Sequence, residues 1–551
     1  MDNFCRKQKI SLSARQSRTR MYKIYPRAAA KTGAQALIKR SINMLTKEWK
    51  NLKNGSDIRG IAVASRNNSI TLTNEAVKRI AAAFGFWVCE KTGKNPEQIK
   101  IAVGNDSRLS APRLKAAVLS ALTETGFCCI DCGLMSTPAM FMTCVVPVLD
   151  CDASIQLTAS HLPYDRNGMK FFTKTGGLEE ANIEVLLEYA QEGCRCPDKP
   201  GSCRTFDFLS LYAEMLVNKV RNGVNSAKNF KQPLKGFKIV VDAGNGAGGF
   251  YVEKVLKPLG ADTSGSQFLE PDGRFPNHIP NPENAEAMAA VTSAVKQSGA
   301  DIGLIFDTDV DRAGAVDSKG KEINRNRLIA LISAILLEER KPAVIVTDSI
   351  TSTGLKKFIE NHGGMHRRFK RGYKNVINEA IRLNQAGQYC PLAIETSGHA
   401  ALKENYFLDD GAYLVTKLLI KMAQLREEGK KLDDLLLGLE EPAESEEFRM
   451  SIDREDFKTY GQAVIDRLTE FAAGTPGWNL APDNYEGVRV SFDKESGDGW
   501  LLLRLSLHEP LMPLNIESNT PGGARTIARK LYPLLYRYKY LDTSSLKEYL
   551  S

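Results

Sequence analysis

The chain has 551 residues, of which 43% are apolar and 25% charged, a composition typical of globular proteins and long enough for several domains of about 150 residues each. No uninterrupted apolar run approaches the roughly 18 residues that a membrane-spanning helix requires, which argues against a membrane protein. The net charge is +9, but residues 1–50 hold thirteen Lys or Arg and two acids, a net of +11. Subtracting +11 from +9 leaves −2 for residues 51–551, so the charge does not indicate nucleic-acid binding.

Residues 1–50 form a basic leader that we expect to be disordered. The leader contains Arg and Ser, is poor in acids and lacks the apolar segment of a secretory signal. It has three interpretations: an organellar transit peptide, which would direct the protein to a plastid, a disordered extension, or an over-long reading frame whose true start is Met44. We favour the last two together. We therefore expect a cytoplasmic protein, in which the eleven cysteines are reduced.

The folded body is expected to begin near Gly55 with alternating strands and helices. Arg59 lies beside a glycine, where its charge can enter a cleft or make a surface salt bridge, and the residues leave both open. A strand over 101–105 ends in polar turn residues, and a helix over about 113–125 and a strand over 127–131 follow. This alternation predicts a parallel sheet with crossover helices.

The stretch from Asp152 to Lys170 contains a candidate nucleophile. Apolar residues alternate over 153–157, which predicts a strand, and the strand ends at Thr158-Ala159-Ser160-His161. A hydroxyl at the carboxyl end of a strand occupies the usual ligand position of open α/β sheets. With His161 and Lys170 as charged partners, Ser160 is a candidate nucleophile, and an ordinary polar turn is the alternative.

A glycine-rich turn follows the strand that begins at Lys238. Such turns between a strand and a helix can bind phosphate. This turn, Asp242-Ala-Gly-Asn-Gly-Ala-Gly-Gly249, lacks the Lys-Ser/Thr ending of a P-loop and does not fit G-x-G-x-x-G well. We therefore favour tight packing as its role.

A second stretch of chemical interest follows an apolar strand over 303–306. It contains Asp307, Asp309 and Asp311, followed by Arg312. Three carboxylates so close repel one another unless a hard cation neutralises them, and oxygen ligands suit magnesium. The sequence therefore predicts a magnesium site here, with a solvated acidic turn as the alternative.

The same pattern begins a third time at Ala343. Strands that end at Asp106, Asp242 and Asp348 are each followed by small polar residues and a helix, which suggests three related α/β domains. In the third unit, Arg371 and Lys374 stand at the start of a helix from about 375. Cations there oppose the helix dipole unless an anion binds beside them, which is a small indication of a phosphate.

The strand from Pro391 leads to a candidate sugar-binding turn. Glu395 and Ser397 can together bind neighbouring hydroxyls of a sugar, and His399 can transfer a proton. From these residues alone, a hydrogen-bonded turn is the stronger interpretation. Beyond it we expect a helix over 411–428, a linker over 442–447, strands over 488–492 and 500–506, and a C-terminal helix over about 522–540.

These motifs resemble those of the α-D-phosphohexomutases, the family of phosphoglucomutase and phosphomannomutase. The family's T-A-S-H-N-P and N-G-x-K match residues 158–170 except at Leu162, and D-G-D-G/A-D-R matches 307–312 at every charged position. The sugar loop G-E-x-S-G-H matches 394–399 except for its first Gly, and the family's G-x-K matches at Lys374. The resemblance covers roughly residues 55–551.

The resemblance implies an α/β fold of three similar α/β domains and a smaller, different fourth around a central cleft. We expect mixed or parallel sheets in the first three domains and an α+β C-terminal domain. After the leader, the expected domains are I (51–230, serine loop), II (231–338, metal loop), III (339–440, sugar loop) and IV (441–551, phosphate loop).

The resemblance also implies a mutase that interconverts hexose 1-phosphate and hexose 6-phosphate of glucose, mannose or both. Its phosphoserine would be Ser160, and its cofactors would be Mg²⁺ and hexose 1,6-bisphosphate, the intermediate and activator. The implied catalytic residues are Ser160, His161, Lys170, Arg59, Arg312 and His399, without a division into acid and base. The implied magnesium ligands are Ser160, through its phosphate, Asp307, Asp309 and Asp311. The implied substrate-binding residues are Lys374, Glu395, Ser397, Arg504 and Ser506.

The phosphate loop departs from the family pattern. The family reads R-x-S-x-T-E-P with another arginine three residues after the proline, whereas this chain has His508 for the Thr and Pro513 for that arginine. A proline cannot grip a phosphate as a guanidinium does. The candidates that could substitute for it are Asn515, Ser518, Asn519 and Arg525.

Three alternative functions remain open at this point. They are a phosphoglucosamine mutase, a metal-dependent phosphohydrolase, and a catalytically weak or inactive homologue that binds sugar phosphates. For all of them the expected partners are small sugar phosphates, with no nucleic acid and no membrane, and the expected assembly is a monomer or homodimer.

Overall fold

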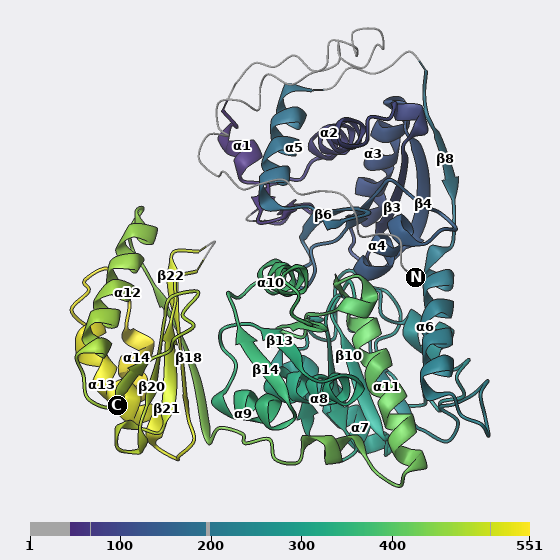
Figure 1. Ribbon diagram of the computed structural model, residues 1–551. Helices are drawn as coiled ribbons and strands as arrows, with labels where there is room; N and C mark the ends of the chain where they lie inside the picture. The colour runs from purple at the N-terminus through teal and green to yellow at the C-terminus, as the bar shows by residue number, and fades with distance from the viewer. Residues whose placement is uncertain (1–43, 67, 194–198, 507–508) are drawn as a thin grey trace.

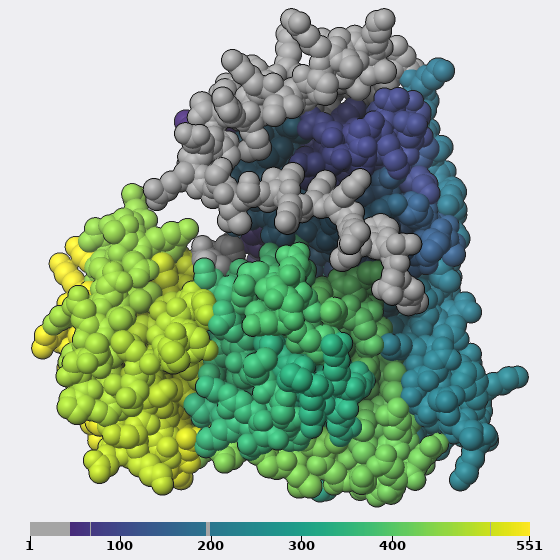
Figure 2. Space-filling view, viewed as in Figure 1, coloured from purple at the N-terminus to yellow at the C-terminus, as the bar shows by residue number. Residues whose placement is uncertain are grey.

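The computed structural model describes residues 44–66, 68–193, 199–506 and 509–551, which form four β-sheets with flanking helices (Figure 1). The interpretations of residues 1–43 and of His508 lie outside the described residues. The C-terminal part, yellow in Figure 1, stands beside the third sheet, and the space-filling view in Figure 2 shows it separated from the blue N-terminal part by a gap. Within the described ranges, no helix is long and apolar enough to span a membrane.

The first sheet is mixed and has the order β1-β2-β6-β5-β3-β4-β8, with β7 paired to β6. Strands β3, β4, β5 and β8 run parallel, whereas β6 is antiparallel to both β5 and β2. The strands are β1 (Lys53–Asn54), β2 (Asp57–Ile61), β3 (Lys100–Asn105), β4 (Cys128–Leu134), β5 (Ala153–Leu157), β6 (Arg166–Thr173), β7 (Gly176–Gly177) and β8 (Ser202–Thr205). The helices are α1 (Lys47–Lys50), α2 (Asn74–Thr92), α3 (Ala111–Glu124), α4 (Thr137–Val145), α5 (Glu180–Glu192) and α6 (Phe208–Val224), with a 3₁₀ turn at Pro96–Gln98.

The second and third sheets are mixed as well. The second has the order β12-β11-β10-β9 and the third β14-β13-β15-β16-β17. The strands are β9 (Ile239–Asp242), β10 (Ile302–Phe306), β11 (Ala313–Asp317), β12 (Glu322–Ile323), β13 (Ala343–Thr347), β14 (Gly364–Arg368), β15 (Leu392–Ile394), β16 (Ala400–Leu402) and β17 (Leu408–Asp409). The helices are a π-helix (Tyr251–Leu256), α7 (Ala285–Ser298), α8 (Arg325–Glu339), α9 (Thr353–Asn361), α10 (Tyr373–Gln385) and α11 (Gly411–Glu427), with 3₁₀ turns at Lys403–Asn405 and Leu432–Leu436.

The first three sheets repeat one arrangement. In each, two neighbouring parallel strands are followed by an antiparallel strand: β3, β5 and β6, then β9, β10 and β11, then β13, β15 and β16. Ser160 lies in the β5–β6 connection, Asp307–Asp311 in the β10–β11 connection and Glu395–Ser397 in the β15–β16 connection. The three predicted motifs therefore occupy equivalent positions. The prediction of repeated α/β domains with mixed sheets is confirmed.

The fourth sheet is antiparallel, with the order β18-β22-β21-β20-β19. Its strands are β18 (Glu444–Ser451), β19 (Trp478–Leu480), β20 (Val488–Phe492), β21 (Gly499–Leu503) and β22 (Leu511–Ser518), and its helices are α12 (Phe457–Ala473), α13 (Gly523–Leu535) and α14 (Ser544–Leu550), with a 3₁₀ turn at Lys494–Ser496. The predicted linker at 442–447 is wrong from residue 444 on, because those residues begin β18. This edge strand begins with three glutamates, none of which is buried, so its composition looks like that of a linker.

Polar groups join the fourth sheet to the third. Arg489 of β20 is 4% exposed and donates to the carbonyl oxygens of Ser349 (2.8 Å) and Thr351 (2.9 Å). Its guanidinium lies 3.6 Å from the centroid of the Trp500 ring, and Trp500 Nε1 donates to Glu517 (2.9 Å). The charge on Arg489 is thus shared by carbonyls and an aromatic face.

Glu517 makes this contact sensitive to pH. Burial raises the pKa of Glu517 from 4.5 to about 7, although the charge on Arg489 opposes this rise. A carboxyl group with a raised pKa makes its full contribution to stability below pH 4.5, where it is neutral in the folded and the unfolded chain. The contribution is lost as the pH rises to about 7, which lowers the free energy of unfolding by about 3 kcal/mol at most.

We expect Glu517→Gln to remove this dependence, because the amide oxygen can still accept from Trp500 and does not ionise. Thermal unfolding followed by tryptophan fluorescence checks this result. The difference between the melting temperatures, wild type minus variant, should decrease as the pH is raised from 4.5 to 7. A constant difference would contradict the assignment.

Candidate active site

Ser160 stands in a strained turn directly after β5. Its φ of 48° is uncommon for a residue other than glycine, and such strain persists only where the surroundings impose it. The Ser160 hydroxyl donates to Asp307 Oδ2 (3.0 Å) and lies 3.3 Å from His161 Nδ1. The fold therefore aims this hydroxyl at the predicted metal loop, 147 residues further along the chain.

Arg108 holds the serine loop through its backbone carbonyls, a role that the sequence did not predict. Its side chain is fully buried and donates to the carbonyl oxygens of Ser160, Leu162, Pro163 (2.7 Å) and Arg166 (2.8 Å). Backbone carbonyls leave no signature in a sequence, so only the position of Arg108 in a polar turn after a strand could have drawn attention to it.

The three aspartates of the metal loop are buried and gathered around one point. One carboxylate oxygen from each of Asp307, Asp309 and Asp311 lies within 4.8 Å of the others. Asp309 Oδ1 and Asp311 Oδ1 are buried and have no hydrogen-bond partner among the described residues. Buried oxygens without partners, in a set made only of carboxylates, fit a hard divalent cation. Thr137, which sequence reasoning missed, binds Asp309 through both its hydroxyl and its amide, the amide at 2.8 Å from the Asp309 carbonyl.

Cations surround these aspartates. Lys170 Nζ lies 3.3 Å from Asp309 Oδ2 and also donates to Asp311. Burial lowers the pKa of Lys170, but the charges of Asp309 and Asp311 outweigh it and raise this pKa well above its usual value. Arg312 Nε lies 3.9 Å from Asp307 Oδ2 and 4.0 Å from Asp311 Oδ1. Two permanent positive charges thus face the metal loop.

Arg59 is held at the edge of the serine loop. Its guanidinium pairs with Asp57 (2.8 Å) and donates to the carbonyl of Thr158, two residues before Ser160. This residue therefore brings a further positive charge to the same loop.

The pKa values of His161 and His399 shift in opposite directions. Burial, together with the charge of Arg312, lowers the pKa of His161 to about 3, so its ring is neutral near pH 7. Burial also lowers the pKa of His399, but Asp409, whose carboxylate bonds to His399 Nδ1, outweighs it and raises this pKa above 6.5. The His399 ring stacks on Tyr373, with centroids 5.3 Å apart. Sequence reasoning missed Asp409, which lies ten residues from its partner.

The metal loop and the sugar loop touch through their backbones. The Ala313 amide donates to the Gly398 carbonyl (3.3 Å), and Arg312 and His399 form an isolated antiparallel bridge. Gly398 has a φ of +92°, and a Cβ atom there would lie 2.6 Å from the Ala313 carbonyl oxygen. Only glycine meets both demands.

The side-chain oxygens of Glu395 and Ser397 differ in their hydrogen bonding. Glu395 Oε1 accepts from the Gly372 amide (2.6 Å), and burial raises the pKa of Glu395 to about 7. Ser397 Oγ is buried, and the described residues offer it no hydrogen-bond partner. A sugar hydroxyl would supply that partner.

The Lys374 side chain points towards domain I and not towards Glu395 of the sugar loop. Its ammonium donates to the Gly177 carbonyl (2.6 Å) and to Glu179 (3.2 Å). With Lys170 and Asp311 it lines a separate cavity of about 100 Å³. Among the described residues, Lys374 and Glu395 share neither a hydrogen bond nor an ion pair, and the role of Lys374 in substrate binding stays a prediction.

The phosphate loop joins β21 to β22. The Arg504 amide donates to the Pro513 carbonyl (3.1 Å), and the Ser506 amide to the Leu511 carbonyl (2.9 Å). Arg504 Nε is buried and lacks a hydrogen-bond partner in the described part of the chain. The loop thus presents a cation with free hydrogen-bonding capacity.

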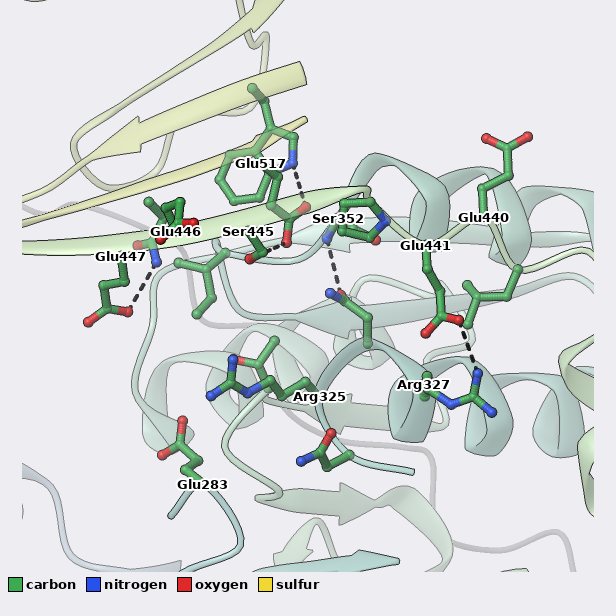
Figure 3. Close-up of a pocket in the computed structure, with 18 of the residues that line it drawn as sticks. Glu283, Arg325, Arg327, Ser352, Glu440, Glu441, Ser445, Glu446, Glu447 and Glu517 are labelled. Carbon is green, nitrogen blue, oxygen red and sulfur yellow. Dashed lines mark hydrogen bonds and ion pairs between the residues drawn. The ribbon is translucent and has the colours of Figure 1, made fainter. Parts of the chain in front are cut away.

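A cavity of about 290 Å³ lies where domains II, III and IV meet. Figure 3 shows Glu446, Glu447 and Glu517 on the strands of domain IV, across from Arg325 and Arg327. Arg371, Thr396 and Asn515 line it as well. Arg371 binds Glu283 (3.3 Å) through its side chain, and its amide donates to Glu486 (3.1 Å).

Of the four candidates to substitute for the missing arginine, only Asn515 lines this cavity. The Ser518 hydroxyl donates to the Gly497 carbonyl (2.6 Å), the Asn519 amide group to Asp498 (3.4 Å) and Arg525 to the Tyr549 carbonyl (2.8 Å). Asn515 is 9% exposed. Asn515 is an amide and brings no charge, so none of these residues replaces a guanidinium beside Arg504.

Comparison with known proteins agrees with this geometry. Sequence profiles of the phosphoglucomutase/phosphomannomutase α/β/α domains I, II and III match residues 50–191, 211–320 and 324–442. A phosphoglucomutase of Neisseria gonorrhoeae is 31% identical over 480 residues, which is 86% of this chain and 94% of that protein. A phosphomannomutase/phosphoglucomutase of Pseudomonas aeruginosa PAO1 is 30% identical over 465 residues, 84% of this chain and 91% of that protein.

A solved structure supports the same conclusion. The crystal structure of a phosphoglucomutase/phosphomannomutase family protein from Burkholderia thailandensis superimposes with a TM-score of 0.72 at 28% identity, over 90% of this chain and 98% of that one. The site brings the Ser160 hydroxyl, which donates to Asp307, next to a group of three buried carboxylates. The chain belongs to the phosphoglucomutase/phosphomannomutase family, whose members are phosphotransferase isomerases.

Proposed function

We propose that the protein interconverts hexose 1-phosphate and hexose 6-phosphate, of glucose, mannose or both. The observation that carries this proposal is the approach of the Ser160 hydroxyl to Asp307, 3.0 Å, from a strained turn. The relatives named above are phosphoglucomutases and phosphomannomutases, which supports this substrate class.

Phosphoryl transfer would take place at the Ser160 oxygen. The bond between this oxygen and phosphorus breaks while the free sugar hydroxyl loses its proton and bonds to phosphorus, and the Ser160 oxygen gains a proton; the product is a hexose 1,6-bisphosphate. After the sugar turns over, its other phosphate returns to Ser160 and the second monophosphate leaves. Asp307, Asp309 and Asp311 would bind Mg²⁺, which would neutralise negative charge on the transferring phosphoryl group.

The chain's own residues then have separate roles. Lys170 and Arg312 hold positive charge beside the transferring phosphoryl group, where electrostatic positioning dominates catalysis. The neutral ring of His161 lies 3.3 Å from Ser160 Oγ, where it can share a hydrogen bond with that oxygen. Glu395 and the unpartnered Ser397 hydroxyl would bind the 3- and 4-hydroxyls, which glucose and mannose present alike.

The distal phosphate would be bound by Arg504 together with Arg371. Glu486 accepts from the Arg371 amide (3.1 Å), and the next residue, Gly487, packs so closely on Arg504 that a Cβ atom would lie 2.7 Å from its Cα. The two arginines therefore flank one short segment of domain IV. Burial and the charge of Arg371 lower the pKa of Arg504, so a bound anion would stabilise its charged form.

We expect Arg371→Gln to raise the KM for glucose 1-phosphate by about 10-fold, through loss of one charge-assisted contact, with a smaller effect on kcat. Steady-state kinetics on the two sugar phosphates checks this result. Arg325→Gln is the control, because Arg325 lines the same cavity but has an exposed side chain. Equal KM values for Arg371→Gln and the wild type would show that Arg371 does not bind the substrate.

The test of the function is phosphosite mapping of the purified protein with an assay of glucose 1-phosphate conversion in Mg²⁺. A phosphate on Ser160 together with glucose 6-phosphate formation is the expected result. Release of inorganic phosphate instead would indicate a hydrolase, and a preference for glucosamine phosphates would indicate the amino-sugar mutase. Binding of hexose phosphate with neither turnover nor phosphorylation by hexose 1,6-bisphosphate would leave a binding protein.

A further inference from the structure

The glycine-rich turn that follows β9, residues 242–249, contacts two functional segments of domain II at once. On one side the Ala247 amide donates to the carbonyl of Thr308, inside the metal loop (2.8 Å). A Cβ atom on Gly246 would lie 2.6 Å from the same carbonyl oxygen, so the turn and the metal loop are in close backbone contact. The metal loop therefore packs directly on this turn.

On its other side the turn holds the segment 268–278 through Asn245. The Asn245 amide donates to the Phe268 carbonyl (2.8 Å), and its side chain donates to the Glu270 carbonyl (2.9 Å) and accepts from Asn277 (2.8 Å). His278 Nε2 lies 3.0 Å from both oxygens of Asp242, which fixes the end of the segment. Both ends of segment 268–278 are thus tied to the turn.

The tip of this segment packs against domain I at Arg108. A Cβ atom on Gly273 would lie 2.3 Å from the Leu109 amide nitrogen and 2.6 Å from the Arg108 Cα, so two backbones meet here without space for a side chain. The Phe275 ring covers the Arg108 guanidinium, whose central carbon lies 5.2 Å from the ring centroid. Arg108 in turn holds the serine loop by four carbonyls.

We propose that Asn245, segment 268–278 and Arg108 form an inter-domain bracket that sets the spacing between Ser160 and the metal loop. The contacts run from Thr308 to Ala247 in the turn, from Asn245 of the same turn to segment 268–278, and from Gly273 in that segment to Arg108, which binds the Ser160 carbonyl. Gly273, Phe275 and Arg108 are positioning residues, because they act on the Ser160 hydroxyl only through the serine loop. The consequence for catalysis rests on the proposed mutase function, whereas the bracket itself does not.

The test is Gly273→Ala. A methyl group at 2.3–2.6 Å from three backbone atoms forces the segment away from domain I by about 1 Å to reach ordinary contact. Because a misplacement of about 1 Å can reduce a reaction rate by about 10²-fold, we expect kcat to fall by about 10²-fold while the KM for glucose 1-phosphate changes by less than about 3-fold. Arg274→Ala is the matched control, since Arg274 is adjacent, 72% exposed and paired only with Asp272 among the described residues.

Hydrogen exchange of residues 158–168 provides a readout that does not depend on turnover. Gly273→Ala and the milder Phe275→Leu should both increase exchange in this segment, while Arg274→Ala and the wild type stay protected. Arg108→Lys should behave like Gly273→Ala, because an ammonium cannot reach four carbonyls. If the wild type shows no mutase activity but this exchange pattern is observed, the bracket is supported and the proposed function is wrong. Unchanged exchange and unchanged kcat in folded Gly273→Ala and Phe275→Leu would overturn the bracket.

Discussion

Ser160→Ala is expected to abolish turnover, with a fall in kcat of about 10³-fold or more, because no other described hydroxyl lies within hydrogen-bond distance of the metal-loop carboxylate Asp307. Intact mass and phosphosite mapping should show a phosphate on the wild-type protein and none on the variant. An active Ser160→Ala protein, or one phosphorylated at the same level elsewhere, would contradict the assignment of the nucleophile.

A second substitution separates this chemical effect from a folding effect. Ser160→Gly also lacks the hydroxyl, but it relieves the strain of a φ of 48°, which typically amounts to about 1–3 kcal/mol. We therefore expect the Gly variant to be as inactive as the Ala variant and to melt at a higher temperature. Ser397→Ala, which removes another buried hydroxyl, should keep the phosphate on Ser160 and weaken sugar binding.

Asp309→Asn is expected to weaken Mg²⁺ binding by about 10²-fold or more, since it removes one of three charges while it keeps the shape of the side chain. Asp309 is the informative choice because its Oδ1 has no partner in the described structure, whereas Thr137 and Lys170 hold its other groups. Titration calorimetry with MgCl₂ measures the effect directly, and kcat should recover in part at high Mg²⁺.

The control for this substitution is Asp317→Asn at the other end of β11. Asp317 is also buried, but it accepts hydrogen bonds from the amides of Lys319 and Lys321 and does not belong to the metal loop. Its substitution should leave Mg²⁺ affinity unchanged. Equal Mg²⁺ affinity for Asp309→Asn and the wild type would exclude Asp309 as a ligand.

The sequence was sufficient to predict those parts of the site whose residues are contiguous. Ser160 and the three aspartates each follow an apolar strand, so their position at the carboxyl edge of a sheet could be predicted from local pattern alone. The repeat was predictable too, because strands ending at Asp106, Asp242 and Asp348 recur with the same neighbours. Family resemblance then supplied the chemistry.

The remaining parts of the site depend on contacts between distant segments. Arg108 binds backbone carbonyls more than fifty residues away, and Thr137 reaches Asp309 across 172 residues. Arg371 and Lys374 are three residues apart at one helix start, yet one lines the cavity shared with domain IV and the other turns towards domain I. No local pattern distinguishes these directions, because tertiary packing decides them.

The β5–β6, β10–β11 and β15–β16 connections occupy equivalent positions, and this equivalence determines how the activity is distributed along the chain. One structural unit has been used three times. In the proposed function, the turn of the first copy would carry the phosphoryl group, that of the second would bind the cation, and that of the third would bind the sugar. No copy is complete by itself. The proposed reaction needs side chains from all three connections, so we expect a fragment that lacks any one of them to be inactive.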